Sequence, residues 1–468
     1  MQVERVVRGA WRKFAGIAAS KLLMFGFTIY VARALGVAFF GQFNFALAYA
    51  GLWAILMDLG LSVVVMREFA GGLDRGTRAM AASLALRFVT VAAGLAGVLA
   101  GLPFLHLGRE AAILTVLMGA AMALDAYARL AAGAFRGRED LGGDAWVLVL
   151  QKAVFVGLAV PLVVLGAGKL AIGWAFLAGY VAVVVWAGFA LARRHGVRLR
   201  LLWEVPAMKE VLAAALPLAV VEFFTVVYFR IDTVMLQAMK GEVTVGIYNA
   251  AYRVIEAAMI FPAAFLSAAF AGFARSWEND RAGLLADTRR SHEWMMAIAA
   301  PGVAVGIALA PQVVALLFGG EFAGSAMDLR ILLPALLAIY PNYVLTQVLI
   351  ASGQQRAYAV YVAACAVFNV AANLVLIPRW ADRGAAAATV ATEALLLVLC
   401  ALRVRRTVGS IPLRRTAELL GASALVGVAT WGACAAWTPA GWIVGAAGVA
   451  AVLHRGIGLG RLASRSSR

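Results

Sequence analysis

Apolar stretches long enough to cross a membrane recur along almost the whole chain, separated by short polar connections. A spanning helix needs about 20 mainly apolar residues. Lipid offers no hydrogen bonds to an exposed backbone, so runs of this length predict helices rather than open sheets or loops. We therefore expect an all-α polytopic membrane protein, with no polar segment long enough to form a soluble domain.

Fourteen of these stretches are predicted to span the membrane. They lie near residues 14–32, 41–64, 80–103, 111–132, 145–167, 170–192, 211–236, 246–271, 294–318, 331–351, 357–378, 384–402, 417–438 and 440–454. The first imitates a signal peptide, because Arg12 and Lys13 precede its apolar run. Lys21 interrupts that run, so cleavage is not expected.

Basic residues are distributed unevenly among the connections. With the N-terminus in the cytoplasm and alternating spans, 28 of the 41 Lys and Arg residues fall inside, 7 outside and 6 within spans. Cytoplasmic loops of membrane proteins carry such an excess. We therefore expect both termini in the cytoplasm, and we attribute the net charge of +17 to topology rather than to nucleic-acid binding.

The sequence contains no pattern typical of a metal or catalytic centre. The three cysteines lie in apolar runs without a CxxC pair, and the four histidines lack metal-ligand spacing. The outside connections are short and hold no His–Asp pair or double carboxylate of the kind a hydrolase or transferase needs. A membrane-embedded glycosyltransferase or ligase is therefore disfavoured, and we expect no catalytic residue, metal or cofactor.

A weak internal repeat divides the chain. Residues 41–46 (GQFNFA) and 246–251 (GIYNAA) share the pattern G-x-[FY]-N-x-A, 205 residues apart, at the same end of two predicted spans. The ends of the fourth and tenth spans match at an offset of 216. Parallel repeats of this kind are common in transporters. We expect two pseudo-symmetric six-helix lobes with an additional C-terminal helix pair and basic tail; these parts are residues 1–205, 206–406 and 407–468.

Charged residues within the predicted spans are the strongest candidates for function. Ionised groups are expensive in lipid and usually face a bundle interior or a watery cavity. The candidate substrate-binding cations are Lys21, Arg87, Arg129, Lys152, Arg230 and Arg253. The candidate carboxyls for coupling to a proton or sodium gradient are Asp58, Asp125, Glu222 and Asp232.

Several of these charges have simpler explanations. Arg129 and Lys152 lie near the cytoplasmic ends of their spans, where long side chains can reach the interface. Residues three, four or eight apart share a helix face and can neutralise each other, as in the pairs Arg253–Glu256, Asp125–Arg129 and Glu222–Arg230. Lys21, Arg87 and Arg230 lie too deep to be explained by loop topology, so these three are predicted to line a cationic cavity.

The order of several motifs resembles the polysaccharide-biosynthesis (O-antigen, Wzx-type) flippases of the multidrug/oligosaccharidyl-lipid/polysaccharide exporter superfamily. The motifs are residues 32–36 (ARALG), 40–43 (FGQF), 58–62 (DLGLS), 67–68 (RE), 230–232 (RID), 246–252 (GIYNAAY) and 320–326 (GEFAGSA). The resemblance covers residues 11–405. It implies a MATE-like arrangement, with two six-helix lobes around a cavity that opens alternately to each side. Many members have twelve spans, so the last two predicted here are additional.

The resemblance also implies a substrate. It implies translocation of an undecaprenyl-diphosphate-linked oligosaccharide to the outer leaflet of the bacterial cytoplasmic membrane, in contact with lipid and near a polysaccharide polymerase or glycosyltransferases. Cationic side chains suit such a substrate, since Arg and Lys bind phosphate. The alternative is an ion-coupled multidrug exporter of the same superfamily. Six acidic residues accompany the six basic ones in the spans, which does not favour a purely cationic substrate.

Overall fold

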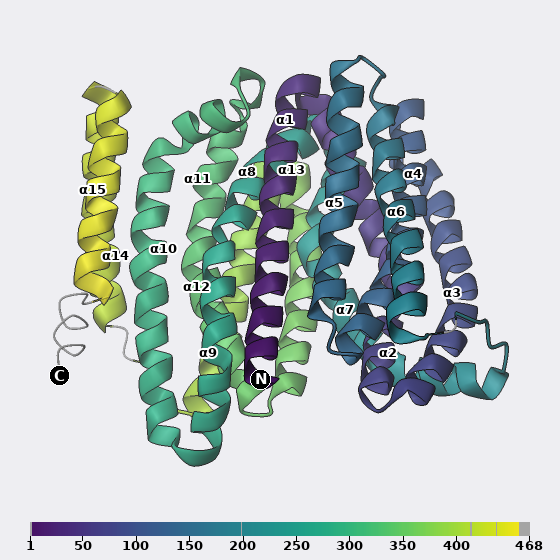
Figure 1. The fold of residues 1–468 in the computed structure, drawn as a ribbon. Helices are drawn as coiled ribbons and strands as arrows, with labels where there is room; N and C mark the ends of the chain where they lie inside the picture. Colours follow the sequence, from purple (N-terminus) through teal and green to yellow (C-terminus); the bar gives the residue numbers. More distant parts are fainter. Residues whose placement is uncertain (1, 198, 412–413, 437, 458–468) are drawn as a thin grey trace. The chain divides into compact units, whose positions relative to one another are not determined.

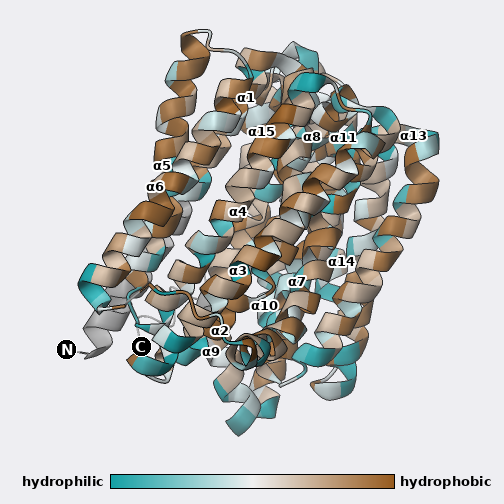
Figure 2. Ribbon diagram, turned by 90° about the vertical axis from the view of Figure 1, so that its right-hand side faces the viewer, coloured by the Kyte–Doolittle hydropathy of each residue, from teal (hydrophilic) through white to brown (hydrophobic). Residues whose placement is uncertain are grey.

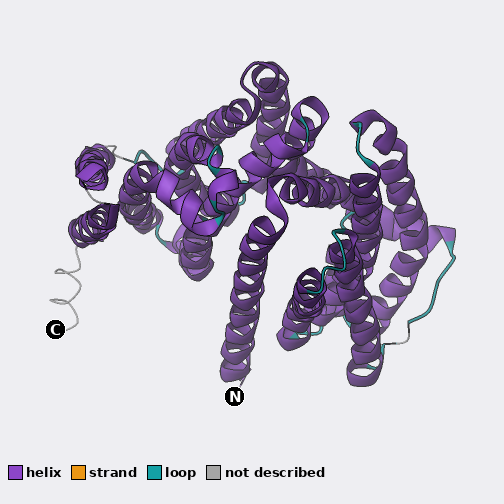
Figure 3. Cartoon of the chain, turned by 90° about the horizontal axis from the view of Figure 1, so that it is seen from above, coloured by secondary structure: helices purple, strands orange, loops and turns teal. Residues whose placement is uncertain are grey.

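The computed structural model describes residues 2–457, except 198, 412–413 and 437. In this part of the chain the regular elements are all helices, joined by short loops (Figures 1 and 3). The predicted all-α fold is therefore confirmed. The α-helices are α1 Gln2–Asp58, α2 Leu61–Ala70, α3 Leu73–Gly101, α4 Arg109–Gly137, α5 Leu141–Val164, α6 Leu170–His195, α7 Val205–Lys240, α8 Glu242–Ala258, α9 Ile260–Asn279, α10 Arg281–Leu317, α11 Ser325–Leu332, α12 Leu336–Ala351, α13 Gln355–Thr407, α14 Arg414–Ala436 and α15 Thr438–Ile457.

Ten helices of the described residues are long and apolar enough to cross a membrane. Two of them each contain two predicted spans, because α1 has a non-helical residue at Gly36 (φ 79°) and α13 has one at Ala381 (φ 49°). The predicted span 246–271 is divided between α8 and α9, and the last predicted span is the short apolar helix α15. Each of the fourteen predicted spans therefore corresponds to helical structure.

One predicted boundary is wrong. The span predicted at 41–64 ends at Asp58, because the next two residues, Leu59 (φ 47°) and Gly60 (φ 75°), adopt left-handed backbone conformations. A left-handed residue ends an α-helix, and the chain resumes as the separate short helix α2.

Hydrophilic residues gather towards the helix ends, and the helices are mostly apolar between them (Figure 2). Many large apolar side chains are exposed, among them Phe104, Val164, Leu425 and Ile443. A soluble protein seldom exposes so much apolar surface. This pattern is typical of helices whose outer faces contact lipid.

The chain divides after Gly246 into two compact units. The first contains α1 to α7, and the second contains α9 to α15 with most of α8. The lobe boundaries near residues 205 and 406 stay predictions. We describe each unit by itself.

The glycines that open the two repeated motifs, Gly41 and Gly246, lie at close backbone contacts within the first unit. A Cβ atom at Gly41 would collide with the carbonyl of Glu242, and one at Gly246 would collide with the carbonyl of Val37. Gln42 also donates a hydrogen bond to the Glu242 carboxylate (2.6 Å). Only glycine allows backbones to approach so closely, which gives a physical reason for the repeated glycine.

The core of the first unit contains residues of α2, α3, α4, α6 and α7, such as Leu61, Leu86, Leu130, Val183 and Val211. Gly133 and Gly137 of α4 lie against the backbone of α2, where a Cβ atom would collide with the carbonyl oxygens of Ser62 and Met66. This is the small-xxx-small spacing by which membrane helices pack closely.

In the second unit, α14 and α15 pack against α10 (Figure 1). Met296, Ala297 and Ala300 of α10 form a small core with Leu419 of α14 and Val452 of α15. The C-terminal helix pair is therefore packed against the rest of this unit rather than separate from it.

Candidate functional site

Five charged side chains from four helices come together in the first unit. They are Asp58 at the end of α1, Arg87 of α3, Asp125 and Arg129 of α4, and Glu222 of α7. We call them the charged cluster. Three carboxylates surround two guanidinium groups, so the cluster carries a net charge of −1 when all its members are ionised.

Arg87 forms the buried half of the charged cluster. Its side chain is 0% exposed, and its Nη1 atom donates to Asp58 Oδ1 (2.8 Å) and to the carbonyl of Met57 (2.8 Å). The hydroxyls of Ser62 and Thr90 donate to Asp58 Oδ2 (3.1 Å) and to Met57 O (3.0 Å). Arg87 therefore neutralises Asp58 and satisfies a carbonyl where α1 ends.

Arg129 forms the accessible half of the charged cluster. Its Nε atom donates to Asp125 Oδ2 (2.7 Å) on the same helix, as the i,i+4 spacing predicts. Its Nη1 atom donates to Glu222 Oε1 (3.2 Å) on α7. The side chains of Arg129 and Glu222 are 48% and 37% exposed. The α4–α7 bridge is therefore partly exposed, unlike Arg87–Asp58.

The other predicted cations lie elsewhere on the chain. Lys21 is exposed on α1, and Arg230 is half-buried on α7. Lys152 of α5 is half-buried, with its Nζ atom 5.8 Å from the ring centre of Phe176. Arg253 of the second unit bonds to Glu256 (2.5 Å), as predicted from their spacing. Their proposed role in substrate binding stays a prediction.

Asp232 is more enclosed than its sequence position suggested. It lies near the outer end of the predicted span 211–236, where a carboxylate can be solvated, but it is only 4% exposed. Its Oδ1 atom accepts a hydrogen bond from the amide of Thr233 (2.7 Å). Burial within α7 excludes the simple solvated alternative.

A second polar group connects α12 and α13 within the second unit. Asn342 Nδ2 donates to Glu393 Oε2 (3.3 Å), Asn373 Nδ2 donates to Asn369 Oδ1 (2.9 Å), and Asn369 Nδ2 donates to Thr392 Oγ1 (3.2 Å). All five side chains are buried. The spacing of Asn369 and Asn373, four residues apart in an apolar run, was the available signal.

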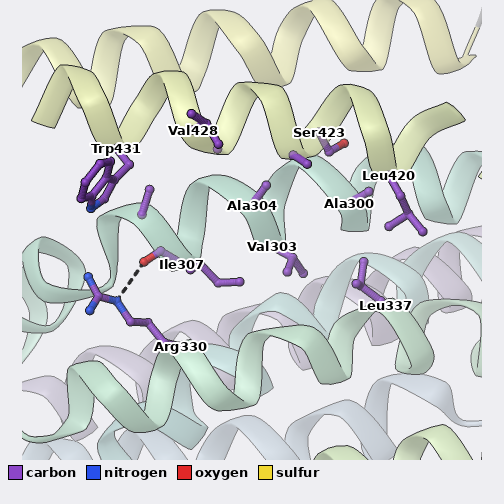
Figure 4. Close-up of a pocket in the computed structure, with 13 residues that line it drawn as sticks. Ala300, Val303, Ala304, Ile307, Arg330, Leu337, Leu420, Ser423, Val428 and Trp431 are labelled. Carbon is purple, nitrogen blue, oxygen red and sulfur yellow. Dashed lines mark hydrogen bonds between the residues drawn. The ribbon is translucent and has the colours of Figure 1, made fainter. Parts of the chain in front are cut away.

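A groove of about 600 Å³ lies between α10, α12 and α14 of the second unit (Figure 4). Its walls are mostly apolar, and Arg330 and Trp431 lie at one end of the view. Arg330 Nε donates to the carbonyl of Ile307 (3.2 Å). A lining of this kind suits a hydrocarbon chain rather than a polar solute, and it holds no arrangement typical of catalysis.

Two family models match this chain. The model described as "Polysaccharide biosynthesis protein" matches residues 6–277, more than half of the chain. The chain belongs to the polysaccharide biosynthesis protein family. The model described as "Lipid II flippase MurJ" matches residues 148–449. The predicted resemblance to polysaccharide flippases of the exporter superfamily is therefore confirmed.

Individual proteins agree with this assignment. The "Probable low-salt glycan biosynthesis flippase Agl15" of Haloferax volcanii is 24% identical over 392 residues, covering 82% of this chain and 80% of that protein. A structure titled "Lipid II flippase MurJ, inward closed conformation" has a TM-score of 0.80 at 9% identity, covering 94% of this chain and 98% of that one. An inward-facing MATE multidrug resistance transporter has a TM-score of 0.70 at 17% identity, covering 83% and 94%. The structural likenesses confirm a MATE-like fold.

Proposed function

We propose that this protein is a flippase that carries an undecaprenyl-diphosphate-linked oligosaccharide from the cytoplasmic to the outer leaflet, for assembly of cell-surface polysaccharide. The observation that carries the proposal is the family match over residues 6–277. The likeness to a named glycan flippase over most of both chains supports it. The proposal describes transport rather than catalysis.

The proposal includes a location and an orientation. The excess of Lys and Arg in alternate connections supports a bacterial cytoplasmic membrane protein with both termini in the cytoplasm. A polymerase or glycosyltransferases acting on the same glycan are proposed neighbours. The purified chain in vesicles is the system that tests transport itself.

We assign the diphosphate to cations that lie outside the charged cluster. Arg87 and Arg129 bond to Asp58, Asp125 and Glu222, so their charge is largely compensated. Lys21, exposed on α1, and Arg230, half-buried on α7, are the stronger candidates. In this account Arg87 and Arg129 position helices, while Lys21 and Arg230 bind phosphate.

Among the four candidate carboxyls, Glu222 is the best placed to couple transport to a proton gradient. Asp58 is 3% exposed and bonded to a wholly buried arginine, so a proton has little access to it. The Glu222 side chain is 37% exposed and joins α7 to α4 through one bond to Arg129. Protonating Glu222 would remove the charge from that bridge and let the two helices separate.

Glu222→Gln should therefore reduce the stimulation of transport by a proton gradient while leaving transport without a gradient unchanged. The neutral amide copies the protonated carboxyl permanently. The measurement is the initial transport rate in vesicles with and without an imposed pH difference. Glu210→Gln, an exposed carboxyl on the same helix, is the matched control. Full gradient stimulation in Glu222→Gln would exclude this carboxyl as the coupling group.

The alternative, an ion-coupled multidrug exporter, is favoured only by the likeness to MATE structures at 16–17% identity. Structural similarity at that sequence identity establishes the fold but not the substrate. Transport of a cationic drug, without transport of the glycan lipid, would favour this alternative.

A further inference from the structure

Helix α11 carries a carboxyl group that is wholly buried. Asp328 is 0% exposed, and neither of its side-chain oxygens accepts a hydrogen bond from an N–H or O–H group of the described residues. An ionised carboxylate in such surroundings costs several kcal/mol unless it is paired or hydrogen-bonded. Asp328 therefore needs either a cation or a proton.

The group that faces Asp328 is a second carboxyl, Asp382. Helix α11 packs against α13, and Asp382 lies within hydrogen-bonding reach of Asp328. Arg383 is the other charged group of the described residues that acts on Asp328, but its side chain is exposed. A cation surrounded by water compensates a buried carboxylate weakly. A hydrogen bond between two carboxyls requires a proton on one of them.

The backbone of α13 fixes the position of Asp382. The preceding residue, Ala381, is non-helical (φ 49°, ψ −128°). The following glycine, Gly384, lies against the carbonyl of Leu376, where a Cβ atom would collide. The chain therefore turns tightly between residues 376 and 384, and Asp382 lies in this turn.

The other end of α11 contacts the start of α8. Ser325 Oγ donates to the carbonyl of Ile247 (2.7 Å), and Gly324 lies against the Ile247 side chain. Within the second unit, α11 thus connects the start of α8 to the turn of α13. A change in the contact between Asp328 and Asp382 would therefore affect both the start of α8 and the turn of α13.

We propose that Asp328 and Asp382 form a proton-binding site in which one shared proton holds α11 against the turn of α13. Two carboxylates this close cannot both ionise without strong repulsion, whereas one proton between them gives a short, charge-assisted hydrogen bond. Loss of the proton leaves two negative charges and weakens the contact.

The site responds to pH in a defined direction. An unfolded Asp releases its proton near pH 3.9. In this proposal the folded protein keeps the shared proton above that pH, so stability falls as pH rises until Asp328 also loses it. In the orientation proposed above, this end of the unit faces outward, so external pH would set the occupancy. Only the outward orientation, and with it the role of external pH, rests on the proposed function.

Infrared spectroscopy of the purified full-length chain tests the shared proton directly. A protonated carboxyl has a carbonyl stretching band that a carboxylate lacks. We expect such a band at neutral pH in the wild type, lost in both Asp328→Asn and Asp382→Asn and retained in the control Asp287→Asn, an exposed carboxyl of α10. A band unchanged in Asp328→Asn and Asp382→Asn would show that the pair is ionised and would overturn the proposal.

Hydrogen exchange of residues 325–332 tests the effect of the proton on α11. After correction for intrinsic exchange rates, protection of these amides should fall as pH rises in the wild type. It should stay constant in Asp382→Asn, because the amide N–H can donate to Asp328 at every pH. Equal pH dependence in the two proteins would overturn the proposed role. Neither measurement depends on glycan transport. The proton-binding site can therefore be refuted without refuting the flippase function, and the flippase function without refuting the site.

Discussion

Arg87→Ala should destabilise the protein by about 3–5 kcal/mol, the usual cost of leaving one member of a buried ion pair alone. The side chain is wholly enclosed, and its loss strands Asp58 without its 2.8 Å partner. It also leaves the carbonyl of Met57 without the donor at the end of α1. The measurement is thermal unfolding of the purified chain in detergent, followed by tryptophan fluorescence.

Two further variants make the Arg87 result specific. Arg78→Ala lies on the same helix, and its side chain is 69% exposed with a 3.8 Å contact to Glu204, so it should change stability by under about 1 kcal/mol. Replacing Arg87 and Asp58 together by leucine should be less damaging than removing either alone, because no buried charge remains. If Arg87→Ala unfolds like Arg78→Ala, the buried pair does not stabilise this fold.

Lys21→Ala and Arg230→Ala should each lower glycan export by about 10- to 100-fold while the amount of protein in the membrane stays unchanged. Removing one charge-assisted contact to a phosphate loses about 1.5–3 kcal/mol. Lys21→Arg should be milder, since the charge remains although its geometry changes. The measurement is surface polysaccharide in cells that depend on this chain for export.

Lys209→Ala controls for a general loss of positive charge, because Lys209 is exposed in the segment proposed to be cytoplasmic. It should export normally. Normal export by both Lys21→Ala and Arg230→Ala would contradict the phosphate-binding role. It would leave the fold untouched, because the fold rests on the apolar runs and on the structural likeness to MurJ.

The helices could be predicted from the sequence because their cause is local. Runs of apolar residues about the thickness of a bilayer leave the backbone few alternatives to a helix. The exception at residues 59–60 is also local, but Asp58-Leu59-Gly60 reads as an apolar run containing one carboxylate. The end of α1 at this point is explained by Arg87 of α3, which bonds to the last turn of α1.

The site could be predicted only in part, because its pairings depend on which helices become neighbours. Asp125 and Arg129 were paired correctly from their spacing in one helix. Glu222 was assigned to Arg230 on the same helix, whereas its bond is to Arg129, 93 residues away. Asp58 had no evident partner in the sequence for the same reason. A charge count gave six candidate cations, but packing decides which of them are neutralised.

Buried residues that seemed outside any span were missed altogether. Asp328 lies between a glycine-rich connection and the predicted span 331–351, so the sequence analysis did not single it out. Its complete burial follows from the packing of α11 against α10 and α13, which no local pattern encodes.

Movement of a diphosphate-linked glycan lipid between leaflets can be measured with the purified protein in vesicles. Vesicles containing the full chain would be loaded with a fluorescently labelled undecaprenyl-diphosphate oligosaccharide in both leaflets. A membrane-impermeant quencher added outside then reports how much label can reach the outer leaflet. We expect quenching of the label beyond the outer-leaflet fraction in vesicles with the wild-type chain, and much slower quenching with Lys21→Ala and Arg230→Ala combined. Quenching that stops at the level of protein-free vesicles would contradict the account.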